Sequence, residues 1–305
     1  LASFKVNAFL PRANLYHPLS SNAPFSVNHI VMASSSSSTI ASTPNWRVLK
    51  GPSDTNDDSA AAAAAQEGAS ILRERQVWSE SSYHDALDLY AKLTDCTDSY
   101  VAGPIEVALN TLDHAFRLYG AESVICSFNG GKDAVVILHL VRAAYAHFCD
   151  EEQRQSEATA TTDTDNNDDT TGGKEIRSVR PRVVYWDHKD EFPEIISFLQ
   201  ESLQAYDLDM ISFEKGVKFK EGLKLLVDNN VPTTAPQVTL PMAFVLGTRG
   251  TDPNAGQQGH FAPSSHYMPP FMRVNPVLDW TYGHVWHFLR LFHLPYCSLY
   301  DEGYT

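Results

Sequence analysis

The sequence of 305 residues lacks several features that mark particular classes of protein. It has only four cysteines and no C-x-x-C pair, which argues against a disulfide framework or a zinc or iron–sulfur site and favours a reducing compartment. No apolar run approaches the roughly eighteen residues of a membrane span, so we expect no membrane partner. Clusters of lysine and arginine are missing and the net charge is −14, so we expect no nucleic-acid partner either.

Acidic residues are absent from the first 53 positions, which also contain a serine run. Such a segment resembles an organellar transit peptide, although Met32 is an equally good start, with the residues before it read through from untranslated message. We therefore expect residues 1–53 to be a disordered leader outside the fold. A cytoplasmic location is expected, or an organellar one if the leader is a transit peptide. The chain begins with leucine, which suggests a fragment.

The remaining sequence divides by composition into a linker and one catalytic domain. Residues 54–80 begin with three acids and a six-alanine run, and we expect a polar linker there. Residues 81–305 form the expected domain, as a monomer and with a truncated C-terminus. Within it, residues 150–175 hold nine acidic and two basic residues, half of the net charge. This run predicts a disordered surface insertion, with metal binding by its acids as the weaker alternative.

Short apolar runs alternate with helical patterns through this domain, which predicts an α/β fold: three layers, α/β/α, around a mostly parallel sheet. Strands are expected at Ser123–Ser127, Arg182–Trp186, Met210–Phe213 and Ala243–Leu246. Helices are expected at Tyr83–Leu93, Pro104–Tyr119, Ala134–Phe148, Phe192–Leu208, Phe219–Asn229 and Tyr282–Phe292, the last capped by Thr281. Residues 250–270 are expected to be an irregular surface loop.

A pair of glycines, Gly130 and Gly131, separates the first of these strands from the helix that follows it. Backbone N–H groups in such a turn, together with the helix dipole, can bind a phosphate. The sequence contains neither G-x-x-x-x-G-K-[ST] nor G-x-G-x-x-G at this place, so the common nucleotide motifs do not apply. An ordinary strand-to-helix turn is the alternative.

Polar residues follow three of the expected parallel strands, at 129–133, 187–191 and 247–252. The carboxyl ends of parallel strands lie at one edge of a sheet, so these segments should border one crevice. The sequence therefore predicts a binding site at that edge.

The same segments resemble the eukaryotic-type FAD synthases (FMN adenylyltransferases) of the phosphoadenosine-phosphosulfate reductase-like superfamily. The residues that carry the resemblance are Ser127–Asp133, Phe244–Arg249, Thr251–Pro253, Pro270–Trp280 and Tyr296–Thr305. It implies an adenine nucleotide α-hydrolase-like fold. It also implies transfer of AMP from ATP to the phosphate of FMN, by in-line attack with Mg²⁺, giving FAD and pyrophosphate.

On the ATP side, the resemblance implies that backbone N–H groups of the glycine turn hold the phosphates, that Asn129 orients the α-phosphate and that Asp133 binds magnesium. Asn129, Lys132 and Asp133 are the expected catalytic residues. The expected ATP-binding residues are Ser127, Phe128, Asn129, Gly130, Gly131, Lys132 and Asp187, with Phe128 against the adenine. Without the resemblance, Asp133 is equally well a carboxylate in a helix's first turn, and Lys132 an exposed side chain.

On the flavin side, the resemblance implies binding by Gly247, Arg249, Asp252, Arg273, Asp279 and Trp280. Arg249 and Arg273 would hold the FMN phosphate, because a guanidinium matches two phosphate oxygens. Asp279 could instead cap a helix, and Trp280 could lie in the core. The chain departs from the family at Gly250, where a second arginine is usual, and at residues 265–268.

Two other functions remain open at this point. One is a sulfonucleotide reductase, which shares the fold but requires a nucleophilic cysteine, and Cys297 does not have the expected setting. The other is a nucleotide- or flavin-binding regulator without catalysis.

Overall fold

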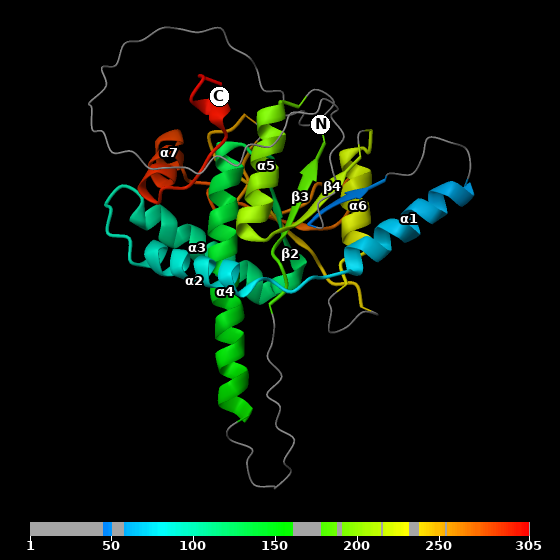
Figure 1. Ribbon diagram of the computed structural model, residues 1–305, viewed down its shortest axis with the longest axis horizontal. Helices are drawn as coiled ribbons and strands as arrows, with labels where there is room; N and C mark the ends of the chain where they lie inside the picture. Colours follow the sequence, from blue (N-terminus) through cyan, green and yellow to red (C-terminus); the bar gives the residue numbers. More distant parts are fainter. Residues whose placement is uncertain are drawn as a thin grey trace, which may run out of the picture.

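The computed structural model describes residues 45–50, 58–160, 178–187, 191–214, 216–231, 238–253 and 255–304, and the strands of this part form one sheet (Figure 1). The strands are β1 (Trp46–Leu49), β2 (Val124–Ser127), β3 (Arg182–Trp186), β4 (Asp209–Phe213), β5 (Ala243–Val245), β6 (Phe261–Pro263) and β7 (Met272–Val274). Their order across the sheet is β1-β4-β3-β2-β5-β7-β6, and every neighbouring pair is parallel except β6 with β7.

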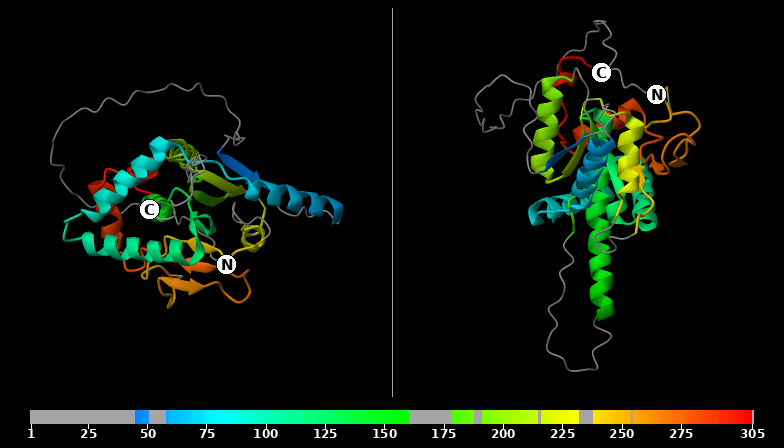
Figure 2. Two further views of the ribbon diagram at one scale, coloured as in Figure 1. Left: turned by 90° about the horizontal axis from the view of Figure 1, so that it is seen from below. Right: turned by 90° about the vertical axis from the view of Figure 1, so that its right-hand side faces the viewer.

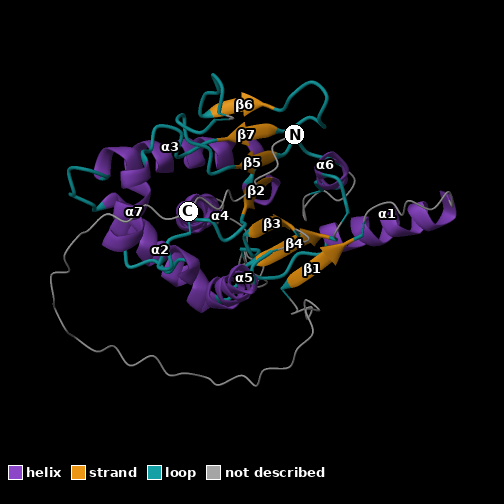
Figure 3. Cartoon of the chain, turned by 90° about the horizontal axis from the view of Figure 1, so that it is seen from above, coloured by secondary structure: helices purple, strands orange, loops and turns teal. Residues whose placement is uncertain are grey.

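Helices cover both faces of the sheet, as the view from above shows (Figure 3). The helices are α1 (Asp58–Arg73), α2 (Glu80–Thr94), α3 (Ala102–Tyr119), α4 (Lys132–Ala160), α5 (Pro193–Tyr206), α6 (Phe219–Asp228) and α7 (Tyr282–Leu291). One face carries α2, α3, α4, α5 and α7 over the larger apolar cluster, and the other carries α1 and α6 over the smaller one. The expected three-layer α/β/α architecture is therefore confirmed.

The winding of the chain reverses beside β2, and this reversal sets the position of the site. From β2 the chain proceeds outward to β3 and β4, and it then returns to the other side of β2 as β5. The loops that leave the carboxyl ends of β2 and β5 therefore lie at the point where the strand order reverses, and ligands of open α/β sheets bind in the crevice outside the strands at such a point.

The predicted strands and helices of the domain are all present, with ends shifted by a few residues except for the C-terminal end of α4. The cap of α7 is also confirmed, because the hydroxyl of Thr281 accepts a hydrogen bond from the His284 N–H at 3.2 Å. Two further strands were not predicted: β6 lies within residues 250–270, which were expected to be irregular, and β7 lies just after them. Three-residue strands are too short to give an alternating pattern, so the sequence alone did not indicate them.

The expected leader and linker were wrong for two segments that belong to the fold. Trp46–Leu49 pairs in parallel with β4, and Trp46 is 1% exposed with its indole N–H donating to the hydroxyl of Ser212 at 2.8 Å. Asp58–Arg73 is a helix, consistent with the high helix propensity of its alanine run, and it buries Leu72 against the smaller cluster. The other residues of 1–57 lie outside the described part, except 45 and 50.

Helix α4 is the longest helix described, 29 residues, and it extends well beyond the sheet (Figure 2). Its acidic end was expected to be disordered, but residues 150–160 are helical. Within this end Arg154 pairs with Asp150 and with Glu151, the latter at 3.0 Å. Extending a helix that packing has already nucleated requires little additional stabilisation, which explains the difference. The centre of the predicted insertion, residues 161–177, lies outside the described residues.

Replacing Trp46 tests whether β1 is part of the folded unit. We expect Trp46→Ala to lower the free energy of unfolding by about 3–5 kcal/mol, because it leaves a cavity and removes a buried hydrogen bond. Val48→Ala is the matched control, since Val48 lies on the same strand but is 38% exposed. Urea denaturation measures both changes. Equal small effects of the two substitutions would show that β1 does not contribute to the folded state.

Candidate active site

The turn between β2 and α4 requires glycine at its centre. Gly130 has φ of +75°, a conformation that side chains disfavour. A Cβ atom on Gly130 would also lie 3.2 Å from Cγ2 of Ile195 and 3.6 Å from Cδ1 of Phe198 on α5. Both the backbone conformation and the space around Gly130 exclude a side chain at this position. Glycine is therefore required for the tight turn that leads into α4.

Two of the three N–H groups in this turn have partners within the protein. The Gly131 N–H donates to Oδ1 of Asn129 at 3.1 Å, so the asparagine amide closes the turn on itself. The Lys132 N–H donates to the hydroxyl of Tyr300 at 2.8 Å. A bound phosphate would therefore enter an existing hydrogen-bond network, in which Asn129 shapes the turn.

Charged side chains connect this turn to the loop after β5. Asp133 in the first turn of α4 lies 3.2 Å from Nζ of Lys132 and 3.0 Å from Nε of Arg249. Arg249 also donates from Nη2 to Oδ1 of Asp252 at 3.1 Å, and its backbone N–H donates to the other carboxylate oxygen at 2.8 Å. The four side chains are between 11% and 32% exposed. Two carboxylates, one guanidinium and one ammonium group leave the cluster without net charge. The Arg249 guanidinium bridges the carboxylates of Asp133 and Asp252 in a partly desolvated crevice.

Gly247 allows β5 and α4 to approach closely. A Cβ atom at this position would lie 3.2 Å from the carbonyl carbon and oxygen of Asp133 and 3.3 Å from its Cβ. Contacts this short with backbone atoms cannot be relieved by rotating a side chain. The lack of a side chain at Gly247 is thus explained by packing against the helix that carries Asp133, and its contact with a flavin stays a prediction.

An aromatic group that the sequence analysis did not assign to the site surrounds Lys132. Nζ of Lys132 lies 5.4 Å from the ring centre of Tyr282 and 5.7 Å from that of Tyr300. Trp286 packs edge-on against Tyr300 with ring centres 5.2 Å apart. The helical spacing of Tyr282 and Trp286 was a usable signal, but a spacing of four residues equally indicates an ordinary core face.

Burial also affects the hydroxyl of Tyr300. Desolvation raises the pKa of this phenol, and the nearby Asp133 carboxylate raises it further, while the hydrogen bond from the Lys132 N–H acts in the opposite direction. The group is therefore protonated near neutral pH.

Two predicted ligand contacts are corrected by burial. The ring of Phe128 is 0% exposed and packs toward Phe198, so it faces the core and not a nucleotide. Trp280 is 2% exposed, and its indole N–H donates to the carbonyl of Pro104 at 3.3 Å. Its place in the core matches the alternative considered from the sequence. Apolar surface burial determines both positions, which leaves only the backbone of Phe128 near the turn.

The other predicted residues lie around the same edge. Ser127 ends β2, and Asp187 directly follows β3. Arg273 on β7 donates to the carbonyl of Pro263 at 2.6 Å. Asp279 is exposed and lies 3.2 Å from Nε2 of His260, so Thr281 and not Asp279 caps α7.

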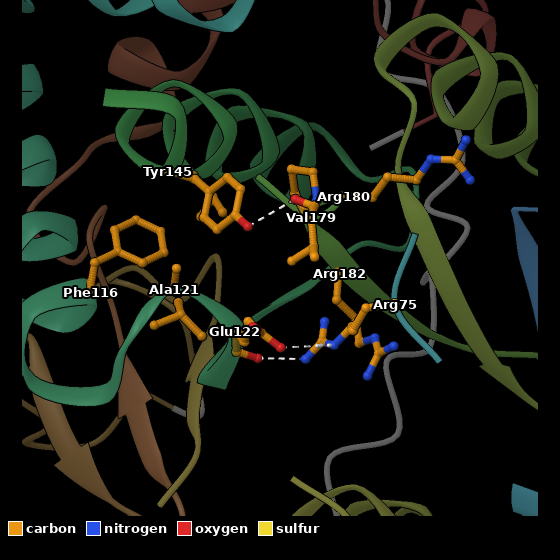
Figure 4. Close-up of a pocket in the computed structure, with 11 residues that line it drawn as sticks. Arg75, Phe116, Ala121, Glu122, Tyr145, Val179, Arg180 and Arg182 are labelled. Atoms are coloured by element: carbon orange, nitrogen blue, oxygen red, sulfur yellow. Dashed lines mark hydrogen bonds and ion pairs between the residues drawn. The ribbon is translucent and has the colours of Figure 1, made fainter. Parts of the chain in front are cut away.

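A small cavity lies at the opposite edge of the sheet (Figure 4). Its volume is about 10 Å³, enough for about one water molecule, and its lining includes Val124 and Arg182, which begin β2 and β3. Arg75 donates to the carbonyl of Glu122 at 2.7 Å, and the Tyr145 hydroxyl donates to that of Val179 at 2.8 Å. Its size and these satisfied contacts indicate a structural element.

Thiol chemistry is not favoured by the environments of the cysteines. All four are free, and burial raises the pKa of Cys126, of Cys149 to about 11, and of Cys297. No group of three or more histidine, cysteine or acidic residues suited to a metal occurs among the described residues. In the same part of the chain, no helix is long and apolar enough to cross a membrane.

Residues 123–305 match the protein family described as the phosphoadenosine phosphosulfate reductase domain. The chain is 31% identical over 201 residues to a probable FAD synthase of Schizosaccharomyces pombe, covering 66% of this chain and 64% of the relative. It is 30% identical over 203 residues to a probable FAD synthase of Caenorhabditis briggsae, covering 66% and 32%. The chain thus matches between about one third and two thirds of the length of these relatives.

Solved structures show the same fold. The FMN adenylyltransferase of Candida glabrata, in complex with FMN and the ATP analog AMPCPP, superposes with a TM-score of 0.53 at 20% identity. The match covers 72% of this chain and 69% of that structure. At this level of identity the likeness establishes the arrangement of strands and helices.

Replacing Gly247 tests the close approach of β5 and α4. We expect Gly247→Ala to lower the free energy of unfolding by about 1–3 kcal/mol, because the added methyl group meets the backbone of Asp133. Gly259→Ala is the control, since the nearest atom to its Cβ would lie at an ordinary 3.5 Å, and its effect should stay within about 0.5 kcal/mol. Urea denaturation measures both. An unchanged stability of Gly247→Ala would contradict the tight packing described.

Proposed function

The chain belongs to the phosphoadenosine phosphosulfate reductase domain family, and we propose that it is an FMN adenylyltransferase, which joins AMP from ATP to FMN. The observation that carries the proposal is the ion pair between Asp133 and Arg249 at the switch point of the sheet. It connects a phosphate-binding turn to a second loop that can bind another anion. The similarity to probable FAD synthases over about two thirds of the chain supports this choice of substrates.

The proposed reaction requires positioning and charge neutralisation more than proton transfer. An oxygen of the FMN phosphate attacks the α-phosphorus of ATP, and the bond from that phosphorus to the pyrophosphate oxygen breaks. A phosphate monoester is largely dianionic near neutral pH, so the nucleophile needs no general base. The protein's part is to hold two anions in line and to offset the charge that develops on the leaving pyrophosphate.

For ATP, the turn of Gly130 and Gly131 would hold the phosphates through backbone N–H groups at the start of α4. Asn129 would act from within the turn, because its amide oxygen already fixes the Gly131 N–H. Lys132 would supply positive charge from a position between two aromatic rings. Ser127, the backbone of Phe128 and Asp187 would border the nucleoside.

Magnesium fits the residues present at this site. Oδ1 of Asp133 is buried and its partner is Nε of Arg249 at 3.0 Å, while Asp252 lies 3.1 Å from Nη2 of the same guanidinium. Mg²⁺ is commonly held by one or two carboxylates together with substrate phosphates, so a larger protein cluster is unnecessary. Asp133 would therefore hold the metal with the phosphates of ATP. When bound, magnesium offsets negative charge on the phosphate oxygens.

For FMN, the loop after β5 would provide the phosphate site. Arg249 presents a guanidinium that is held in place by Asp133 and Asp252, and Gly247 keeps this loop against α4. Such a preorganised fork suits a phosphate. Arg273 and Asp279 would lie farther along the same edge and contact the rest of the flavin.

Sulfonucleotide reduction, which shares this family and fold, is disfavoured by the thiols. That chemistry requires an accessible thiolate. Cys297, the cysteine nearest the C-terminus, is 2% exposed and its pKa is raised by burial, so it remains a protonated and inaccessible thiol near neutral pH.

An assay with ATP, FMN and Mg²⁺ tests the proposal directly. We expect FAD and pyrophosphate to form in equal amounts, measured by chromatography and by a coupled pyrophosphate assay. Formation of sulfite from a sulfonucleotide would favour the reductase instead. Binding of ATP and FMN without any FAD formation would favour a non-catalytic regulator.

Replacing Asp133 tests the proposed metal and phosphate site. We expect Asp133→Ala to reduce kcat for FAD formation at least about a hundredfold, because the leaving pyrophosphate loses electrostatic stabilisation. Asp113→Ala is the control, since Asp113 pairs with Arg117 on the exposed face of α3, and its kcat should change by less than about twofold. Near-normal turnover of Asp133→Ala would show that the assignment of Asp133 is wrong.

A further inference from the structure

The hydroxyl of Tyr300 lies inside the phosphate-binding turn. It accepts the hydrogen bond from the Lys132 N–H at 2.8 Å, and a Cβ atom on Gly131 would lie 3.7 Å from the same oxygen. This N–H is the first of α4, and helix N-termini of this kind commonly bind phosphate. The C-terminal segment thus enters the turn from a distant part of the sequence, beside the start of α4 (Figure 1).

The same hydroxyl has a hydrogen that remains available. In the described part of the chain, the hydroxyl of Tyr300 accepts from Lys132 but donates to no protein acceptor. Burial and the neighbouring Asp133 carboxylate raise the pKa of the phenol, so the proton is retained near neutral pH. A partly buried O–H beside a cluster of N–H groups is complementary to an anion, since a phosphate oxygen accepts several such bonds.

The ring that carries this hydroxyl is held firmly. Tyr300 ends a short 3₁₀ helix, Ser298–Tyr300, and packs against Trp286 and Tyr296 with ring centres 5.2 Å and 6.5 Å apart. The other side of the ring faces Nζ of Lys132. A hydroxyl positioned by packing on a helix binds a ligand without first losing conformational freedom.

We infer that Tyr300 is a phosphate-binding residue of the ATP site, an inference that rests on the proposed function. Its oxygen continues to accept from the Lys132 N–H while its O–H donates to a phosphate oxygen. The phenol thereby extends the reach of the first N–H of α4 to the ligand. Tyr90 on α2 serves as a comparison, because its ring stacks on that of His147 with ring centres 4.0 Å apart, about 22 Å along α4 from the turn.

Replacing each tyrosine by phenylalanine isolates the hydroxyl groups. We expect Tyr300→Phe to raise KM for ATP about tenfold or more, the range for losing a hydrogen bond to a charged group, with KM for FMN unchanged. Tyr90→Phe should change both constants less than about twofold. Loss of the hydrogen bond from the Lys132 N–H should lower the midpoint of thermal unfolding of Tyr300→Phe by only a few degrees, so thermal unfolding should show that both variants are folded in the assay. An unchanged or lower KM for ATP in Tyr300→Phe would overturn the inference.

A binding measurement separates this inference from the proposed reaction. Calorimetric titration of the full chain with inorganic pyrophosphate and Mg²⁺ should show about tenfold weaker binding by Tyr300→Phe than by the wild type and Tyr90→Phe. If the wild type forms no FAD but this difference is found, the reaction is wrong and the phosphate-binding role of Tyr300 stands. Absence of pyrophosphate binding by the wild type, or equal binding by all three proteins, would overturn the role.

Discussion

The crevice depends on the contact between the start of α4 and the end of β5. Because Gly247 has no Cβ atom, the end of β5 packs directly against the backbone of Asp133. The Asp133–Arg249 ion pair then joins the loops that leave the neighbouring strands β2 and β5. The ion pair depends on the close packing, because the Arg249 guanidinium reaches the Asp133 carboxylate only if the helix starts close to the strand. The switch point of the sheet places the two loops at the carboxyl ends of neighbouring strands, and this contact joins them.

An anion can enter the crevice by replacing the carboxylates that now pair with Arg249 and Lys132. Asp133 and Asp252 share one guanidinium, while Lys132 lies between a carboxylate and aromatic faces. The side chains are therefore paired in the absence of ligand, which avoids unpaired charge in a partly desolvated site. Ligand phosphates, which carry the charge opposite to that of Arg249 and Lys132, can take over contacts that the carboxylates now make.

Local patterns predicted the strands β2 to β5 and the helices α2 to α7, because each has either a buried run or a helical period of sufficient length. They did not indicate β1, whose four residues pair with a strand more than 160 positions away. For the site, the glycine turn and the β5 loop carried recognisable residues. The burial of Phe128 and Trp280 and the entry of Tyr300 depend on tertiary packing, which no short stretch of sequence encodes.

The length of α4 reconciles an acidic chain with an anionic ligand. Its first turn lies at the crevice, whereas the acidic residues beyond Asp133 begin at Asp150, eighteen positions after Lys132, which at helical rise is about 27 Å away. The Debye length at physiological ionic strength is about 8 Å, so the electrostatic potential of those acids is largely screened at the turn. The helix therefore acts as a spacer, and the net charge of the chain is a poor guide to the field that a nucleotide meets at the crevice.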